Sequence, residues 1–301
     1  MMRTPFTGLG TALVTPFTKD GSIDEAAVRR LVDRQIAAGV HFLSPCGTTG
    51  EAPTLSQSEK VRVVELVVGA AAKRVPVLAG AGGYNTRDVI ALAREFERVG
   101  ADGILSVTPY YNKPSQEGLF QHYTAIADST SLPIVLYNVP GRTGVNLEVR
   151  TVARLSALGN IVGVKEASGN VVQMSDVLAA AHDGFFLLSG DDPLAVAVMA
   201  IGGRGLISVA SNAIPGEMTQ IIELAEKGDL SGARRLHAWL LPFLEANFVE
   251  SNPIPIKAVM AAMGLIEETY RLPLVPPGPA TRDRLSSVLQ DLKLLGSASR
   301  A

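Results

Sequence analysis

The sequence has little of what several classes of protein require. Its 301 residues include a single cysteine, Cys46, so no disulfide can form within the chain, and such usage is typical of a reducing compartment. Its four histidines are scattered and lack the spacing of metal ligands. No glycine-rich segment completes a Walker loop or a dinucleotide-binding pattern. We therefore expect any catalysis to come from protein side chains, with no metal and no cofactor.

Long apolar runs and an excess of charge of one sign are also missing. No uninterrupted apolar stretch reaches the ~18 residues of a membrane-spanning helix, and the N-terminal segment lacks a signal-like apolar core. The formal net charge of −2 argues against nucleic acid or an anionic membrane surface as the main partner. The sequence therefore predicts a soluble, cytoplasmic protein that acts on small molecules.

Short apolar segments alternate with longer helical patterns over about two thirds of the chain. The candidate strands cover 8–16, 41–47, 75–82, 103–109, 133–140, 161–168, 185–191 and 205–211. Two of the helical segments open with residues typical of an N-cap, Ser56 and Thr86, and the second ends at Gly100. This alternation indicates right-handed βαβ units and predicts an α/β fold, a closed (β/α)8 TIM barrel, with an open doubly wound sheet as the alternative.

The last part of the chain has a different pattern. Segments 229–248 and 255–265 look helical, and no low-complexity linker precedes them. We therefore expect residues 1–226 to form the catalytic barrel and residues 227–301 to form a C-terminal helical region.

Polar residues gather at the ends of the predicted strands. Active sites of (β/α)8 barrels lie at the C-terminal ends of the strands and in the loops that follow. The side chains expected at this end of the barrel belong to Thr48, Thr49, Tyr110, Tyr111, Tyr137, Arg142, Lys165 and the SGDD segment 189–192. Their convergence at one end is more specific than any single motif among them.

Lys165 is the unusual residue in this set, because lysine is rarely buried in a strand. Strand alternation places Gly163 and Lys165 on one face and Glu166 on the other. If the glycine face lines the barrel interior, the lysine amine reaches the cavity, where it could attack a carbonyl carbon and form a Schiff base. Considered alone, Lys165 could equally extend from the strand end into solvent.

Each neighbouring polar residue also has one interpretation as a catalytic or binding residue and one as an ordinary structural residue. The hydroxyl groups of Tyr137 and Tyr111 can relay protons if they are hydrogen-bonded in a chain, which Thr48 could bridge; otherwise they are aromatic residues at the rim. Thr49 could bind a carboxylate or simply form a turn, and Arg142 suits a bidentate carboxylate clamp or a solvated loop charge.

Two further segments are interpreted as structural. Cys46 has no histidine that could activate it and is expected to be a small buried residue. The IGGRG segment, 201–205, could cradle a phosphate, but a turn before the eighth strand is the favoured interpretation.

Several longer motifs resemble those of the dihydrodipicolinate synthase family, within the pyruvate-dependent Schiff-base aldolases that include N-acetylneuraminate lyase. They include GTTGE (47–51), VTPYYNKPSQEGL (107–119), LYNVPGRTG (136–144), GVKEASGN (163–170) and FVESNPIPIKA (248–258), and the similarity runs essentially end to end. The resemblance implies a lyase that condenses pyruvate with L-aspartate 4-semialdehyde to 4-hydroxy-tetrahydrodipicolinate, in lysine and diaminopimelate biosynthesis.

The resemblance also implies roles for individual residues. Lys165 would form the Schiff base with pyruvate, and Tyr137 would donate and accept protons above it. Thr48 would link Tyr137 to Tyr111, which in this family reaches in from a neighbouring subunit. Members of the family are commonly homotetramers built from tight dimers, so the resemblance implies the same assembly here.

Substrate binding is implied for three more residues. Thr49 would hold the pyruvate carboxylate, Ile207 would line the same pocket through its backbone, and Arg142 would bind the carboxylate of the second substrate. Branches of the superfamily that act on keto-sugar acids lack arginine in the matching loop, so Arg142 favours the synthase. Another pyruvate-dependent aldolase or dehydratase, and a non-catalytic binding protein on the same scaffold, are the alternatives.

One departure from the family concerns regulation. Feedback-inhibited members typically place two histidines and an asparagine where this chain has Gln57, Lys60 and Tyr84. A cationic Lys60 would repel a lysine ligand, and the sequence therefore predicts weak or absent inhibition by lysine.

Overall fold

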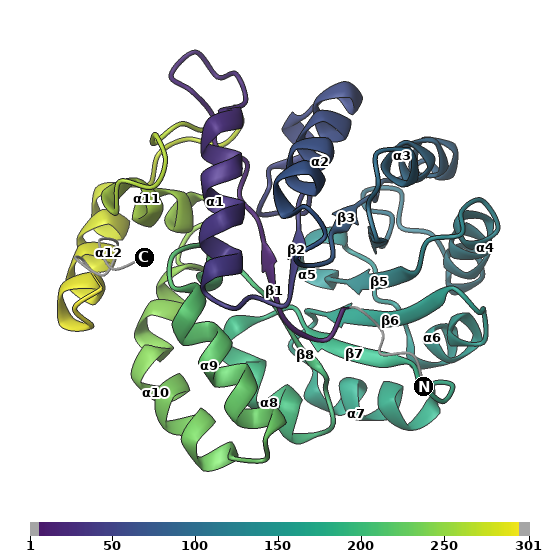
Figure 1. The fold of residues 1–301 in the computed structure, drawn as a ribbon. Helices are drawn as coiled ribbons and strands as arrows, with labels where there is room; N and C mark the ends of the chain where they lie inside the picture. Colours follow the sequence, from purple (N-terminus) through teal and green to yellow (C-terminus); the bar gives the residue numbers. More distant parts are fainter. Residues whose placement is uncertain (1–5, 295–301) are drawn as a thin grey trace.

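The computed structural model describes residues 6–294 and is built around a closed parallel sheet (Figure 1). The strands run in the order β2-β1-β8-β7-β6-β5-β4-β3, and a parallel bridge between Leu43 and Val77 joins the two ends of this order. The strands are β1 Gly8–Ala12, β2 Phe42–Ser44, β3 Leu78–Gly80, β4 Gly103–Val107, β5 Ile134–Asn138, β6 Ile161–Glu166, β7 Phe186–Ser189 and β8 Gly205–Ser208. The predicted barrel and its eight strands are confirmed, and the open sheet is excluded.

Helices surround the strands as an outer layer (Figure 1). They are α1 Glu25–Ala37, α2 Gln57–Ala71, α3 Thr86–Arg98, α4 Gln116–Ala127, α6 Val149–Ser156, α7 Val171–Ala180, α8 Ala195–Ala200 and α9 Pro215–Glu226. The short helix α5 Pro140–Thr143 lies in the loop that follows β5. Three short 3-10 turns, η1 Ala52–Thr54, η2 Asp192–Leu194 and η3 Ala210–Asn212, lie in loops that follow β2, β7 and β8.

The helix boundaries show where local sequence rules hold. Ser56 caps α2, as predicted, and also forms a capping box with Glu59. For α3 the prediction of Thr86 was wrong by one residue: the N-cap is Asn85, because the Thr86 hydroxyl is instead paired with His122 Nδ1 at 2.9 Å. Gly100 follows the end of α3 with φ +89°, a conformation that suits glycine.

The C-terminal helices continue the outer layer on one side of the barrel (Figure 1). α10 Leu230–Ala246 packs against α8 and α9, and α12 Pro279–Asp291 packs against α10 and α11 Ile254–Ala262. The two helical patterns predicted after the eighth strand are confirmed as α10 and α11. The division of the chain at residue 226 stays a prediction, and residues 1–5 and 295–301 of the two predicted regions lie outside the described residues.

Two apolar layers result from strand alternation. One lies between strands and helices, and the other fills the barrel interior, where Phe6 and Phe42 pack edge to face with ring centroids 5.8 Å apart. The interior layer consists of Phe6, Ala12, Phe42, Leu78, Leu105, Val135, Tyr137, Val139, Phe186, Leu188 and Ile207. The barrel is therefore a packed core, and a polar site can open only at its end.

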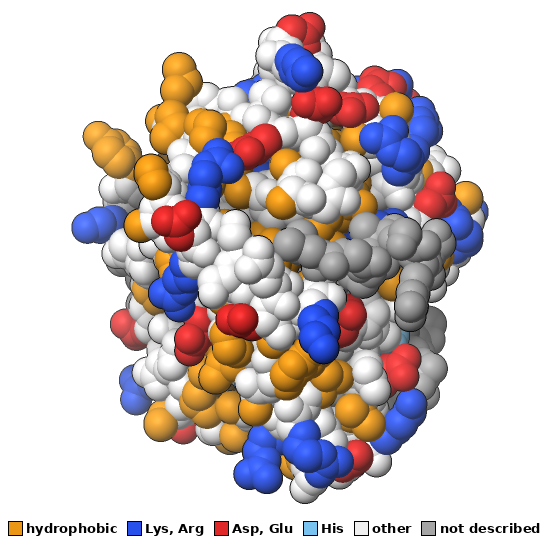
Figure 2. All heavy atoms as spheres, turned by 90° about the vertical axis from the view of Figure 1, so that its left-hand side faces the viewer, with side chains coloured by type: hydrophobic (Ala, Val, Ile, Leu, Met, Phe, Trp, Pro, Cys, Tyr) orange, Lys and Arg blue, Asp and Glu red, His pale blue; other side chains and the backbone are white. Residues whose placement is uncertain are grey.

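Within residues 6–294 no helix is long and apolar enough to cross a membrane. On the face formed by the C-terminal helices, acidic and basic side chains are interspersed (Figure 2), in keeping with the small net charge.

Candidate active site

Lys165 and Tyr137 meet inside the barrel. They lie opposite each other on the paired strands β6 and β5, and both are 6% exposed. The Lys165 Nζ atom stands 4.3 Å from the centroid of the Tyr137 ring. The lysine side chain therefore points to the barrel interior and not along the strand into solvent, as the interpretation with an interior glycine face requires.

Two glycines near Lys165, Gly163 and Gly190, have different side chains packed against them. A Cβ atom on Gly163 would lie 2.5 Å from the Phe186 ring, so the space beside this glycine is filled by Phe186. A Cβ atom on Gly190, in the SGDD segment after β7, would lie 2.9 Å from Lys165 Cε and 2.8 Å from Ala167 Cβ. Gly190 therefore makes the room for the lysine side chain.

Glu166 is buried on the opposite face of β6, as predicted. Its carboxylate accepts hydrogen bonds from Asn138 Nδ2 at 2.9 Å, the Ser168 backbone N–H at 2.7 Å and Gln173 Nε2 at 3.3 Å. These bonds tie the end of β6 to β5 and α7. The carboxylate thus holds the strand that carries Lys165 and faces away from the cavity.

A cavity of about 240 Å³ opens above Tyr137. Two basic side chains, Lys60 from α2 and Arg142 from α5, contribute to its wall, and no acidic side chain of residues 6–294 lines it. Its polar and aromatic wall includes Cys46, Thr48, Lys60, Tyr110, Tyr137 and Arg142. A pocket with two cations and no anion suits a ligand that carries carboxylates.

The remaining predicted site residues do not line this cavity, and Lys165 reaches it only through its contact with the ring of Tyr137, which does. Ile207 on β8 is buried in the same interior layer as Tyr137. Thr49 is 3% exposed, and its Oγ1 accepts a hydrogen bond from Asn252 Nδ2 at 3.0 Å. Sequence reasoning gave Asn252 no role, because the contact joins residues that are 203 positions apart.

Among the predicted site residues, Tyr111 has its side chain in solvent, away from the others, within a single chain. Its side chain is 90% exposed, and its backbone has φ +69°, a strained value for a residue other than glycine. Next to it, Tyr84 and Tyr110 pack edge to face at 5.3 Å. Within residues 6–294 of one chain, Thr48 forms no hydrogen bond to Tyr137 or Tyr111, so the expected relay stays a prediction.

Two aspartates at the end of β7 add charge near Lys165. Asp192 is buried, and its carboxylate accepts bonds from Ser208 Oγ at 2.5 Å and from the backbone N–H groups of Val209 and Ala210. Burial raises the pKa of Asp192, and these bonds oppose that shift. Burial, together with the neighbouring Asp192, raises the pKa of Asp191 to about 6.

Cys46 and the IGGRG segment have the structural roles predicted for them. The Cys46 side chain is buried, and burial raises the pKa of its thiol to about 12, which removes it as a nucleophile near neutral pH. Gly202 and Gly205 adopt positive φ values of 106° and 145° in the turn that leads into β8.

Comparison with known proteins places the chain in one family. The model of the "Dihydrodipicolinate synthetase family" matches residues 5–292. A 4-hydroxy-tetrahydrodipicolinate synthase of Koribacter versatilis is 50% identical over 295 residues, which cover 98% of each chain.

Solved structures agree with this assignment. The synthase of Methylacidiphilum fumariolicum SolV has a TM-score of 0.94 at 42% identity, covering 98% of each chain. The chloride-inhibited dihydrodipicolinate synthase of Acinetobacter baumannii, complexed with pyruvate, has the same TM-score and identity, covering 96% of this chain and 99% of its own. This chain therefore belongs to the dihydrodipicolinate synthetase family.

Proposed function

We propose that this chain catalyses the condensation of pyruvate with L-aspartate 4-semialdehyde to 4-hydroxy-tetrahydrodipicolinate, in lysine and diaminopimelate biosynthesis in the cytoplasm. The chain is a lyase of the family described above. The observation that carries the proposal is Lys165, a buried amine that faces the Tyr137 ring at 4.3 Å and has no ion-pair partner among residues 6–294.

The first half of the reaction uses Lys165 and Tyr137. The lysine amine attacks the ketone carbon of pyruvate, and loss of water leaves a Schiff base. The Tyr137 hydroxyl serves as the proton donor and acceptor for these steps, and the position of the Tyr137 ring 4.3 Å from the amine supports this role. Thr49 holds the pyruvate carboxylate, with the Ile207 backbone lining the same pocket.

The second half takes place toward the mouth of the cavity. Removal of a methyl proton converts the Schiff base to an enamine, whose carbon attacks the aldehyde and re-forms the Schiff base. The amino group of the second substrate then attacks the Schiff-base carbon, which closes the ring and releases the Lys165 amine. Arg142 binds the carboxylate of the aldehyde substrate, which its position in the cavity wall supports. Thr48 links Tyr137 to Tyr111 of a neighbouring subunit, and the exposed Tyr111 side chain supports a homotetramer built from tight dimers.

The decisive test is reduction with borohydride in the presence of pyruvate, followed by mass measurement. We expect one reduced pyruvate adduct on Lys165, and the absence of an adduct would overturn the proposal.

Steady-state assays with different aldehydes then separate the synthase from the alternative, since preference for a sugar aldehyde over aspartate 4-semialdehyde would favour a different aldolase. Sedimentation at assay concentration tests the tetramer.

Regulation by lysine is a separate part of this proposal. Lys60 lies in the cavity wall and Tyr84 is 56% exposed beside Tyr110. A cation at this position repels the lysine ammonium groups, so we expect millimolar lysine to leave the initial rate unchanged. A sharp fall of the rate in lysine would contradict this expectation.

A further inference from the structure

The FVESNPIPIKA motif contains two buried polar side chains that the proposed reaction does not use. Asn252 is 6% exposed and Lys257 is 0% exposed, and both contact the GTTGE loop that follows β2. This loop carries Thr48 and Thr49. The C-terminal region of the chain is therefore in direct contact with residues that are placed in the active site.

Lys257 anchors the end of the loop through Glu51. The Lys257 Nζ and Glu51 Oε1 atoms are 2.5 Å apart, and both side chains are fully buried. The ammonium group also donates to the Thr15 carbonyl oxygen at 3.3 Å and lies 4.5 Å from the centroid of the Phe17 ring. Because a buried carboxylate without this partner would be very unfavourable, the pair fixes the position of Glu51.

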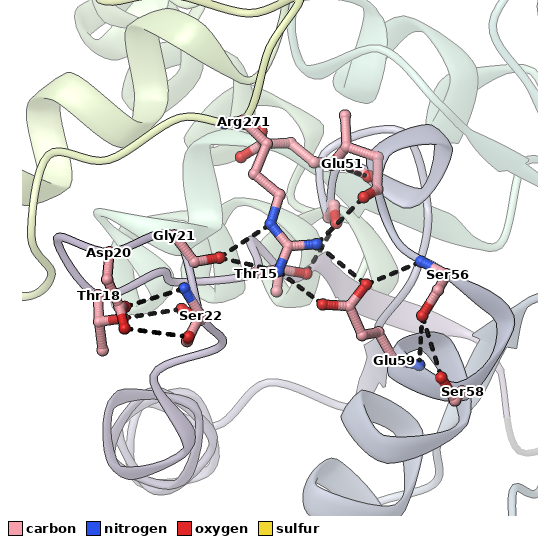
Figure 3. Close-up of polar contacts among 12 residues, drawn as sticks. Thr15, Thr18, Asp20, Gly21, Ser22, Glu51, Ser56, Ser58, Glu59 and Arg271 are labelled. Atoms are coloured by element: carbon pink, nitrogen blue, oxygen red, sulfur yellow. Dashed lines mark hydrogen bonds and ion pairs between the residues drawn. The ribbon is translucent and has the colours of Figure 1, made fainter.

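Arg271 fixes the following segment from the same side (Figure 3). Its guanidinium group donates to the Gly21 carbonyl oxygen at 2.8 Å, to Glu59 at 2.6 Å and to the Thr54 carbonyl oxygen at 3.1 Å. The hydrogen bonds that Glu59 accepts from Arg271, and next those from Ser56, lower the pKa of its carboxyl to about 2. The loop after β2 is thus held at Glu51 and Thr54, and the first turn of α2 at Glu59, by residues of the C-terminal region.

Asn252 contacts Thr49, the residue assigned to the pyruvate carboxylate. Its Nδ2 atom donates to Thr49 Oγ1 at 3.0 Å. A threonine hydroxyl that accepts a hydrogen bond still has its own hydrogen to donate. The amide of Asn252 therefore leaves the Thr49 hydroxyl hydrogen free for a carboxylate, whereas an acceptor at this position would take that hydrogen.

We propose that Asn252 is a positioning residue that holds the Thr49 hydroxyl as a hydrogen-bond donor to the pyruvate carboxylate, in a loop anchored by the Lys257–Glu51 pair. The inference rests on the proposed function, because it assigns Thr49 to pyruvate. It links the last helices of the chain to the affinity for the first substrate.

The test is the Asn252→Asp variant of the full chain, which keeps the shape of the side chain and replaces the donor with an acceptor. The new carboxylate takes the Thr49 hydroxyl hydrogen, so we expect the KM for pyruvate to rise about tenfold or more, while kcat changes by less than about threefold. As the pH falls and the new carboxyl becomes protonated, it can donate again. The ratio of the variant KM to the original KM should then fall toward one.

Asn247→Asp is the matched control. Asn247 is also buried, donates through Nδ2 to the Phe243 carbonyl oxygen at 2.8 Å and, like Asn252, has an amide oxygen without a hydrogen-bond partner among residues 6–294. The control introduces a buried carboxyl in the same region without touching the loop. It is expected to lower Tm without a comparable change in the KM for pyruvate.

A double-mutant cycle with Thr49→Val separates hydroxyl positioning from simple charge repulsion. In the Thr49→Val background, Asn252→Asp should raise the KM for pyruvate by less than about twofold, because the hydroxyl is already absent. An equal rise in both backgrounds, or an unchanged KM in the single variant, would overturn the inference. If the unmodified chain forms no pyruvate adduct, the proposed function itself fails, and the two failures are distinguishable.

Discussion

The molecule buries two lysines in two very different environments. Lys257 faces the carboxylate of Glu51, the Thr15 carbonyl oxygen and two aromatic rings. Lys165 faces the ring of Tyr137, and among residues 6–294 it has no ion pair and no hydrogen bond. Burial lowers the pKa of Lys257, and Glu51 opposes this shift.

The difference shows which buried amine is available for reaction. An amine whose hydrogens are engaged by a carboxylate and a carbonyl has no lone pair to offer and serves to hold the structure. Lys165 has no hydrogen bond or ion pair among residues 6–294, faces the Tyr137 ring and interacts with the Asp192 carboxylate only at longer range, so its amine is available to react with a ligand. The two lysines can therefore be separated by substitution.

The largest expected effect on activity is that of Lys165→Met. This variant should lose the pyruvate adduct, and kcat should fall by roughly a thousandfold or more. Its Tm should be no lower than that of the original protein, because an apolar side chain of similar length replaces a buried amine without an ionic partner. Adduct mass and calorimetry measure the two effects, and a clear loss of stability would show that Lys165 is structural.

Lys257→Met should have the opposite profile. It leaves the Glu51 carboxylate buried without its cation, and unfolding in urea should show a loss of about 3–5 kcal/mol. The folded fraction should still form the adduct on Lys165. In the double variant Glu51→Gln/Lys257→Met most of the stability should return, and a double variant less stable than Lys257→Met would contradict this account.

Local sequence patterns predicted the barrel and which residues share a face of the strand with Lys165, and they left the direction of its side chain open. Strand alternation puts Lys165 on the face of Gly163, and that face is interior in the structure. The same patterns could not predict Asn252 or Lys257 as partners of the loop after β2. Those contacts join residues 203 and 206 positions apart. A local sequence pattern carries no information about contacts over such separations.

Gly190 is the residue that sequence reasoning placed at the right end of the barrel without recognising its role. Its meaning depends on where the Lys165 side chain passes, and that is set by the packing of β6 against β7. The signal in the sequence was only a glycine after a strand, which is typical of any turn.

Gly190→Ala tests how tightly the reactive lysine is held. The added methyl group would lie 2.8 Å from Ala167 Cβ and 2.9 Å from Lys165 Cε. We expect overpacking to cost about 1–3 kcal/mol of stability, and displacement of the amine should lower kcat by roughly tenfold or more. Gly216→Ala is the control, because a Cβ atom there meets nothing within 4 Å. Equal kinetics for the two variants would exclude a role for Gly190 in placing Lys165.

Asp191→Asn has the smallest expected effect and adds the pH dependence to the comparison. Burial and the adjacent Asp192 raise the pKa of Asp191 to about 6 from 3.8, so the folded state binds this proton more tightly than the unfolded state. The group therefore destabilises the fold above about pH 6, and this cost disappears as the pH falls toward 4. Allowing for solvent screening, Asp191→Asn should raise the free energy of unfolding in urea by ~1–2 kcal/mol near pH 7 and leave it unchanged near pH 4.

The control is Asp183→Asn, at an exposed position, whose free energy of unfolding should show no such pH dependence. A loss of stability for Asp191→Asn at neutral pH would mean that the carboxylate, like Glu51, has found a partner that offsets its burial.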